Sequence, residues 1–167
     1  KPYCRHHQHC SNKYGYIVLN TSNKSESAVG YGTLYGDDIG SISIAGDLYK
    51  CEIYDVARYI NREKEIIPEN ILLKAPSAEL HPGQLDTDSL PPYEVIDSIL
   101  YRMIEEGQHR EEIINAGFNA EDVHRIHSML VRSEYKRYQF CPTLRLSTCP
   151  LGKGIVIPLT SKYGFGY

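Results

Sequence analysis

The stretch that decides the fold is residues 21–37, which read Thr21-Ser22-Asn23-Lys24-Ser25-Glu26-Ser27-Ala28-Val29-Gly30-Tyr31-Gly32-Thr33-Leu34-Tyr35-Gly36-Asp37. It follows an apolar run, residues 16–19, whose length and polar boundaries are typical of a buried parallel strand. A polar turn at the carboxyl end of such a strand, opening into a helix, is where α/β sheets bind ligands. Small residues, a carboxylate and free helix amides meet there, which predicts a site for a nucleotide and its metal ion.

Helix signals follow this strand, predicted over residues 14–20, in two places. Asn23 is a good N-cap, and Glu26 three residues later completes a capping box, so a helix is predicted from about Lys24. A second helix is predicted with Asp47 as its N-cap. Its apolar positions step by four, three and four, which is a helical face: Tyr49, Ile53, Val56 and Ile60.

The rest of the chain divides by composition. Residues 1–10 include Cys4-Arg5-His6-His7-Gln8-His9-Cys10, whose spacing fits no standard zinc pattern, and they are predicted to be an unstructured or foreign leader. Residues 11–85 are predicted to form a partial α/β nucleotide-binding domain. A proline-rich loop over residues 74–92 is long enough to be functional or mobile. Residues 86–139 are predicted to be helical, and residues 140–167 an extended tail.

The helical region carries two clear local patterns. Asn119 is predicted to cap a helix that runs toward Lys136, with Phe118 and Val123 placed as a hydrophobic staple. Before it, a helix from residue 93 has one apolar face, formed by Val95, Ile96, Ile99, Leu100 and Met103.

Composition sets broad limits on function. The chain has 167 residues, enough for one domain with a real core, and a net charge of −3, which gives no sign of a nucleic-acid or membrane partner. Its apolar runs are too short for a transmembrane helix. Five cysteines without a Cys-x-x-Cys pair favour reduced thiols in a cytoplasmic protein.

Several candidate residues have a structural alternative. Glu26 serves either as a helix cap or as a ligand of Mg²⁺ beside phosphates, and the two roles are compatible. Lys50 lies in the first turn of its predicted helix, where it either attracts phosphate or is simply solvated. Ser77 lies in the long loop, where a turn hydrogen bond competes with contact to a phosphate or metal. Lys136 ends a helix, where basic residues are common.

Histidines and familiar phosphate loops give no further site. His124 and His127 are one turn apart and are predicted to lie on the surface and in the core, respectively, rather than on a metal. The sequence has no Gly-x-x-x-x-Gly-Lys-Ser/Thr or Ser-Gly-Gly phosphate loop. It therefore shows half of a nucleotide site, without the loop that grips pyrophosphate.

Several long blocks, in order over about residues 11–160, resemble the NAD⁺ synthetase family, and most closely the synthetase domain of its glutamine-dependent form. The blocks are Asn23-Lys24-Ser25-Glu26, Val29-Gly30-Tyr31-Gly32-Thr33-Leu34-Tyr35-Gly36-Asp37, Asp47-Leu48-Tyr49-Lys50, Pro76-Ser77-Ala78-Glu79-Leu80, Pro82-Gly83-Gln84, Asp86-Thr87-Asp88-Ser89-Leu90-Pro91-Pro92-Tyr93 and Glu134-Tyr135-Lys136-Arg137. The resemblance implies the C-terminal part of an adenine-nucleotide alpha-hydrolase-like, ATP-pyrophosphatase fold. This is a Rossmann-type parallel sheet followed by a helical region.

The resemblance also implies a reaction and its residues. Deamido-NAD⁺ is amidated to NAD⁺ through an adenylate, with ATP and Mg²⁺ as cofactors and ammonia supplied from glutamine. ATP would contact Thr21, Lys50 and Ser77, and Mg²⁺ would be held by Glu26, with Ser77 as a second candidate. Catalytic roles fall to Lys50 and Lys136. Deamido-NAD⁺ would contact Tyr31, Gly32, Thr33, Leu34, Tyr35, Asp37 and Lys136.

The resemblance further implies that the pyrophosphate loop, the first strands of the sheet and the glutaminase domain are missing from this chain. We therefore expect a fragment that is incomplete for catalysis and that associates with itself through an exposed sheet edge. The alternative is a non-catalytic, oligomerising scaffold piece of the same enzyme. Another ATP-pyrophosphatase ligase is a third candidate, which the blocks over residues 23–37 and 76–93 disfavour.

Overall fold

The computed structural model describes residues 3–77, 82–152 and 154–160. Parts of the predicted leader, loop and tail, namely residues 1–2, 78–81, 153 and 161–167, lie outside the described residues. Among the helices of the described ranges, none has the length and apolar character needed to cross a membrane. The elements, in chain order, are α1 (Tyr3–Tyr14), β1 (Leu19–Asn20), α2 (Lys24–Val29), β2 (Ile42–Ser43), α3 (Lys50–Ile60), α4 (Glu69–Leu73), the 3-10 helix η1 (Asp86–Asp88), α5 (Tyr93–Ile104), α6 (Arg110–Asn115), α7 (Ala120–Arg132) and α8 (Glu134–Arg137).

The sheet of the described residues is short and parallel. β1 pairs with β2 in parallel, with Leu19 opposite Ile42, and the tail adds a bridge to Ser43 from Thr143. The parallel pairing was predicted, but the buried strand over residues 14–20 is wrong in extent and burial. Only its last two residues are strand, and Tyr16 and Ile17 are 65% and 71% exposed. Within the described residues β1 has one neighbouring strand, so little packs against its apolar side chains.

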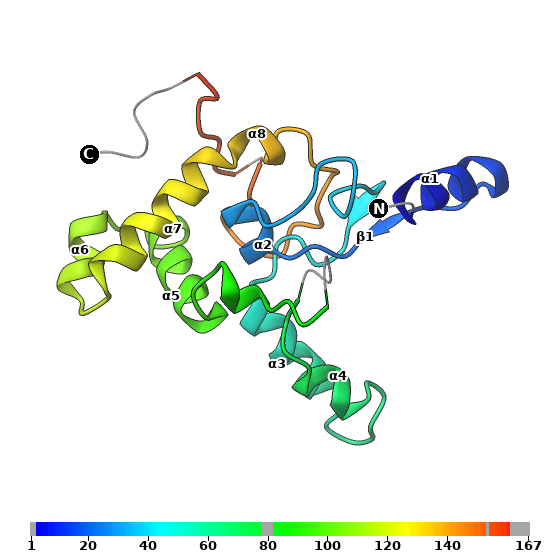
Figure 1. The fold of residues 1–167 in the computed structure, drawn as a ribbon, viewed down its shortest axis with the longest axis horizontal. Helices are drawn as coiled ribbons and strands as arrows, with labels where there is room; N and C mark the ends of the chain where they lie inside the picture. The colour runs from blue at the N-terminus through cyan, green and yellow to red at the C-terminus, as the bar shows by residue number, and fades with distance from the viewer. Residues whose placement is uncertain (1–2, 78–81, 153, 161–167) are drawn as a thin grey trace.

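Helix α2 lies at the centre of the molecule, against α3, α5, α7 and α8 (Figure 1). The predicted capping box is confirmed, since the Asn23 side chain accepts from the Glu26 amide and the Glu26 side chain accepts from the Asn23 amide. Buried Ala28 and Val29 pack into the core. This cap places Glu26 at the start of the helix, on the side where the strand ends.

The core lies where α2 meets α5, α6 and α7. The predicted face of α5 is confirmed, because its three middle members are fully buried and Val95 and Met103 pack against them: Ile96, Ile99 and Leu100. Asn119 also caps α7 as predicted, accepting hydrogen bonds from the amides of Glu121 and Asp122. The helical region therefore provides a rigid platform beneath the polar turn after β1.

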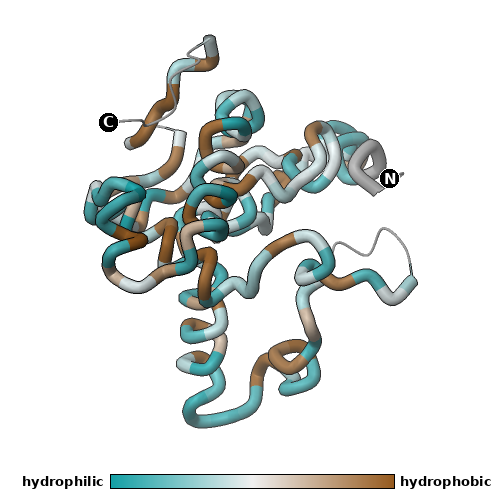
Figure 2. The backbone as a smooth tube through the Cα atoms, turned by 60° about the vertical axis from the view of Figure 1, so that its left-hand side comes forward, coloured by the Kyte–Doolittle hydropathy of each residue, from teal (hydrophilic) through white to brown (hydrophobic). Residues whose placement is uncertain are grey.

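Helix α3 departs from its prediction at both ends. Tyr49, not Asp47, is its N-cap residue, because the Asp47 carboxylate instead accepts hydrogen bonds from the tail. Only the first part of the predicted apolar face is buried, and Val56 and Ile60 are exposed. Beyond its first turn α3 leaves the body, and with α4 it forms a projecting arm (Figures 1 and 2).

The prediction of an unstructured leader is wrong for its described residues. Residues Tyr3–Tyr14 form α1, which lies at one edge of the molecule beside β1 (Figure 1). Helix α1 is polar on average, and its exposed Tyr14 ring stacks on Tyr16 with 5.7 Å between centroids. The charged, histidine-rich composition therefore gave no sign of this helix, whose described side chains, those of residues 7–14, are mostly exposed.

Candidate functional site

A polar hollow of about 540 Å³ opens at the carboxyl end of β1. It gathers most of the residues that the sequence singled out, although they come from two segments far apart in the sequence. The predicted site residues that line it are Thr21, Glu26, Tyr31, Gly32, Thr33, Asp37 and Ser77. Ser22, Gly30, Gln84, Asp86 and Ser89 complete the lining. The fold thus brings the turn after β1 and the proline-rich loop together around one space.

Lys50 and Glu26 form an ion pair beside this hollow. The Lys50 Nζ lies 3.2 Å from Glu26 Oε1, and Glu26 Oε2 accepts from the Asn23 amide at 3.2 Å. The two side chains are 21% and 20% exposed, so the pair is reachable from solvent. Glu26 therefore caps α2 and also presents a charged oxygen beside a lysine, as the sequence allowed.

The helix amides, in contrast, are not free. The amides of Lys24 and Glu26 at the start of α2 donate to Leu48 O and Asn23 Oδ1. Those of Lys50 and Cys51 at the start of α3 donate to Ser25 Oγ and Asp97 Oδ2. The expectation that free amides attract phosphate is therefore wrong at these positions, and side chains must carry that role.

Lys136 braces the turn that follows α2. Its ammonium donates to the carbonyls of Gly30 and Gly32 at 2.7 and 2.6 Å. Gly30 has a left-handed φ of 70°, ends α2, and donates its amide to Glu26 O. Lys136 is not among the described residues that line the hollow. It positions the Tyr31 turn from behind, and its contact with substrate stays a prediction.

The segment after this turn is tied down by Asp37. Its carboxylate accepts from the Thr33 amide at 3.0 Å, and its carbonyl accepts from the Asn20 side chain at 2.8 Å. Leu34 and Tyr35 are not among the described lining residues. The Tyr35 backbone is left-handed, with φ 57°, and its hydroxyl donates to Gln139 at 2.6 Å. The tight turn therefore points Tyr35 toward Gln139, just after α8.

Two tyrosines, Tyr31 in the lining of the hollow and Tyr93 on α5, have raised pKa values. Burial raises the pKa of Tyr31, and burial together with the carboxylates of Glu26 and Asp86 raises the pKa of Tyr93. The Tyr93 hydroxyl donates to Asp86 Oδ2 at 2.9 Å. Ser77 donates its hydroxyl to the Gln84 carbonyl, which is the turn role that the sequence left open. Each of these groups can donate a hydrogen bond, but none of them adds positive charge.

The described carboxylates that line the hollow do not form a complete cage for a metal ion. Within the described ranges, no three or more His, Cys, Asp or Glu residues are arranged to hold a metal. Mg²⁺ is usually bound by one or two carboxylates together with substrate phosphates and water. Glu26 on the hollow fits that pattern. His124 is exposed and His127 buried, as predicted.

Sequence reasoning missed a buried ionic cluster beneath the site. The Lys24 ammonium lies 3.1 Å from Asp47 Oδ1, donates to Ser147 Oγ and pairs with Glu105, and the Lys24 and Asp47 side chains are fully buried. A lysine inside a capping motif gives no local signal of burial, because its partners come from distant segments. The cluster fastens the tail to α2.

Asp47 makes stability depend on pH. Burial alone would raise the pKa of this carboxyl, but the amides of Ser147 and Leu146, the Lys24 ammonium and the Ser147 hydroxyl outweigh it and hold the pKa below its ordinary value. A carboxyl with a lowered folded-state pKa stabilises the fold above its unfolded pKa, and this is lost as pH falls through the folded value. Asp47→Asn is therefore expected to be clearly destabilising at about pH 6 and progressively less so below about pH 4.

Thermal unfolding of both proteins across this pH range tests the expectation. Asp55→Asn is the control, because Asp55 pairs with Arg58 on the surface and should matter little at any pH. A stability difference for Asp47→Asn that is constant down to about pH 3 would contradict the assignment.

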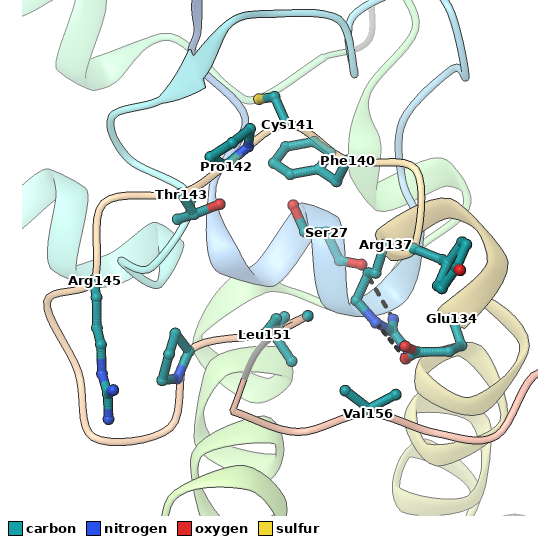
Figure 3. A pocket seen from close by; sticks show the side chains of 14 residues that line it. Ser27, Glu134, Arg137, Phe140, Cys141, Pro142, Thr143, Arg145, Leu151 and Val156 are labelled. Carbon is teal, nitrogen blue, oxygen red and sulfur yellow. Dashed lines mark hydrogen bonds and ion pairs between the residues drawn. The ribbon is translucent and has the colours of Figure 1, made fainter.

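A second pocket of about 380 Å³ lies under the tail and is mainly apolar (Figure 3). Arg137 and Glu134 pair at its wall with 2.8 Å between Nη2 and Oε2, so the buried charges cancel. Ser27 from α2 points toward Phe140 across it. None of the residues predicted for the nucleotide site lines this pocket.

Comparison with known proteins identifies the family of this chain. The family model described as NAD synthase matches residues 4–140, so the match begins inside the predicted leader. The chain is 48% identical, over 92% of its length, to glutamine-dependent NAD(+) synthetases of Synechocystis sp. and Thermotoga maritima. It spans about a quarter of the length of these curated relatives, 27% in both cases.

Solved structures give the same fold. An NMN synthetase from Francisella tularensis superposes with a TM-score of 0.65 at 29% identity, over 89% of this chain and 52% of that one. A glutamine-dependent NAD(+) synthetase from Cytophaga hutchinsonii gives a TM-score of 0.73 over 93% of this chain and 26% of that one, with 20% identity. The first of these likenesses and the family model agree, and the chain belongs to the NAD synthase family.

Proposed function

We propose that this chain forms part of an enzyme that amidates deamido-NAD⁺ to NAD⁺ at the expense of ATP. One observation supports this most strongly. The hollow at the end of β1 collects seven residues that the family resemblance assigned to ATP, Mg²⁺ and deamido-NAD⁺, with the Lys50–Glu26 pair beside it. A space of about 540 Å³ lies within the range of small-molecule sites, 300–1,000 Å³.

The proposed reaction has two steps. A carboxylate oxygen of deamido-NAD⁺ attacks the α-phosphorus of ATP, and the bond to the β-phosphate oxygen breaks to release pyrophosphate. Ammonia then attacks the activated carbonyl carbon, AMP leaves with the electron pair of the carbon–oxygen bond, and the nitrogen loses a proton. Positive charge near the phosphates lowers the barrier of the first step.

The chain's own residues supply charge and orientation. Lys50 can turn its ammonium from Glu26 to a phosphate, and Thr21 can donate its hydroxyl at the same end of the hollow. Tyr31, Thr33 and Asp37 also line the hollow, where they would hold deamido-NAD⁺. Glu26 would hold Mg²⁺, which neutralises phosphate charge when bound. The alignment of two nucleotides in one space also lowers the barrier of the reaction.

Titration calorimetry with ATP plus Mg²⁺, and separately with deamido-NAD⁺, tests this proposal. Lys50→Ala is expected to weaken ATP binding by about tenfold or more, because a charge-assisted contact to phosphate is lost. Glu26→Ala is expected to weaken the Mg²⁺-dependent part of that binding. Lys64→Ala is the matched control, since Lys64 is exposed on the arm. Unchanged nucleotide binding in both site variants would refute the proposal.

A second candidate is the non-catalytic, self-associating scaffold. Exposed apolar side chains on the arm favour it, among them Tyr59, Ile66, Ile71 and Leu73, which are 57–76% exposed. Apolar patches exposed on soluble proteins mark interaction sites. A chain that binds neither ATP nor deamido-NAD⁺, yet has a mass above that of a monomer by light scattering, would support the scaffold. A compact monomer would count against it.

A further inference from the structure

A single carboxylate from α5 holds the start of α3. Asp97 is 7% exposed, and its Oδ2 accepts from the Cys51 amide at 2.8 Å. Its Oδ1 accepts from the Ser25 hydroxyl, and the same Ser25 oxygen accepts from the Lys50 amide at 2.9 Å. Asp97 therefore engages the first two amides of α3, one directly and one through α2.

This anchor matters because α3 has few others. In α3, all of whose residues are described, Ala57 is the one buried residue, and the helix then runs out into the arm. The Tyr49 side chain makes no capping hydrogen bond to the helix. A carboxylate at a helix N-terminus satisfies amides that have no partner within the helix and also complements the helix dipole. Asp97 supplies both effects from a rigid neighbouring helix.

The same helix also contacts the other end of Lys50. Tyr93 stands one turn before Asp97 on α5, and the Lys50 Nζ lies 5.3 Å from its ring centroid. The ammonium is 3.2 Å from Glu26, which lies next to Ser25 on α2. The Lys50 amide is thus held by Ser25, which Asp97 holds in turn, and the Lys50 ammonium lies beside Tyr93 and Glu26. Movement of the α3 start would carry the ammonium away from the hollow.

We propose that Asp97 is a positioning residue, which acts through Ser25 and the start of α3 to hold the Lys50 ammonium where it meets the nucleotide phosphates. This inference rests on the proposed function. Asp97 itself is not among the described residues that line the hollow, so it would act on binding only through Lys50.

A double-mutant cycle tests whether Asp97 works through Lys50. Asp97→Asn keeps the side chain's size but places a donor or a weaker acceptor against the Cys51 amide. It is expected to weaken ATP·Mg²⁺ binding about fivefold to tenfold. In a Lys50→Ala background the same substitution should have no further effect, because the group it positions is gone. Effects that multiply independently would overturn the proposal.

Asn119→Ala is the matched control, because it removes a helix cap with two accepted amides far from the site. It should lower the melting temperature and leave ATP binding unchanged. Ser25→Ala provides a milder second variant if Asp97→Asn folds poorly, and it should reproduce the weakened binding. An Asn119→Ala effect on binding as large as that of Asp97→Asn would mean that general stability explains both, and would overturn the proposal.

Amide hydrogen exchange separates this inference from the proposed function. In Asp97→Asn the Lys50 and Cys51 amides should exchange at least about tenfold faster, while the amides of α7 keep their rates. If the unmodified chain binds no ATP, the proposed function fails, and with it the phosphate-directed role of Asp97. The exchange rates then still decide whether Asp97 holds the α3 start. Unchanged exchange at Lys50 and Cys51 would overturn that as well.

Discussion

Replacing Lys24 with methionine is expected to lower the free energy of unfolding by about 3–5 kcal/mol, which is the cost of leaving buried charges without their partner. Methionine has nearly the same length and removes only the ammonium. The side chains of Asp47 and Glu105, which are 0% and 9% exposed, would then have no cation beside them. The contact of the ammonium with the Tyr49 ring, at 5.0 Å from the centroid, would be lost too.

Thermal and urea unfolding of the two proteins measure this effect. For a domain of this size, such a loss lowers the melting temperature by on the order of 10 °C. Arg58→Met is the control, because it removes a cation from an ion pair whose side chains are 68% and 72% exposed. That variant should lose no more than about 0.5 kcal/mol. Equal losses in the two variants would show that the buried cluster has no special weight.

The parts of the fold that sequence predicted correctly depend on residues three or four positions apart. The capping box of α2 and the Asn119 cap of α7 are of this kind, and so is the buried face of α5. The wrong predictions concern polar side chains whose hydrogen-bond partners lie far away in the sequence. Asp47 looked like an N-cap, yet it bonds to amides some 99 and 100 residues away. No local pattern records such a choice, and α3 begins at Lys50 with Tyr49 as its N-cap residue.

The site was predictable for a different reason. Composition alone marked a polar turn after a strand, whereas the grouping of Ser77 with Thr21 and Tyr31 came from the family resemblance and is seen in the hollow. The hydrogen bonds that hold the site in place could not be predicted from the sequence. Lys136 pairs with carbonyls 104 and 106 residues away, and Asp97 with a hydroxyl 72 residues away. Both residues support the site from behind, where motifs give no indication of contact.

Gly30→Ala is expected to destabilise the protein by about 2–5 kcal/mol and to abolish binding of deamido-NAD⁺, because it combines two penalties. Its φ of 70° is unfavourable for a residue with a Cβ. A Cβ at this position would also lie 2.1 Å from Ser133 Oγ and 2.7 Å from Ser133 Cβ. Relief of that clash would shift the carbonyls that Lys136 holds, and with them the Tyr31 turn on the hollow.

Gly15→Ala separates the two penalties, because Gly15 has nearly the same φ, 69°, and no atom lies within 4 Å of the position that a Cβ would take there. It should lose only the backbone part, about 1–2 kcal/mol, and keep its ligand binding. Adding Ser133→Gly to Gly30→Ala removes both clashing atoms, so stability should return to about the level of Gly15→Ala and binding should reappear. Melting temperatures and calorimetric titration with deamido-NAD⁺ measure these outcomes. If Gly30→Ala behaved like Gly15→Ala from the start, the close packing of the α2 end against Ser133 could not be what shapes the turn.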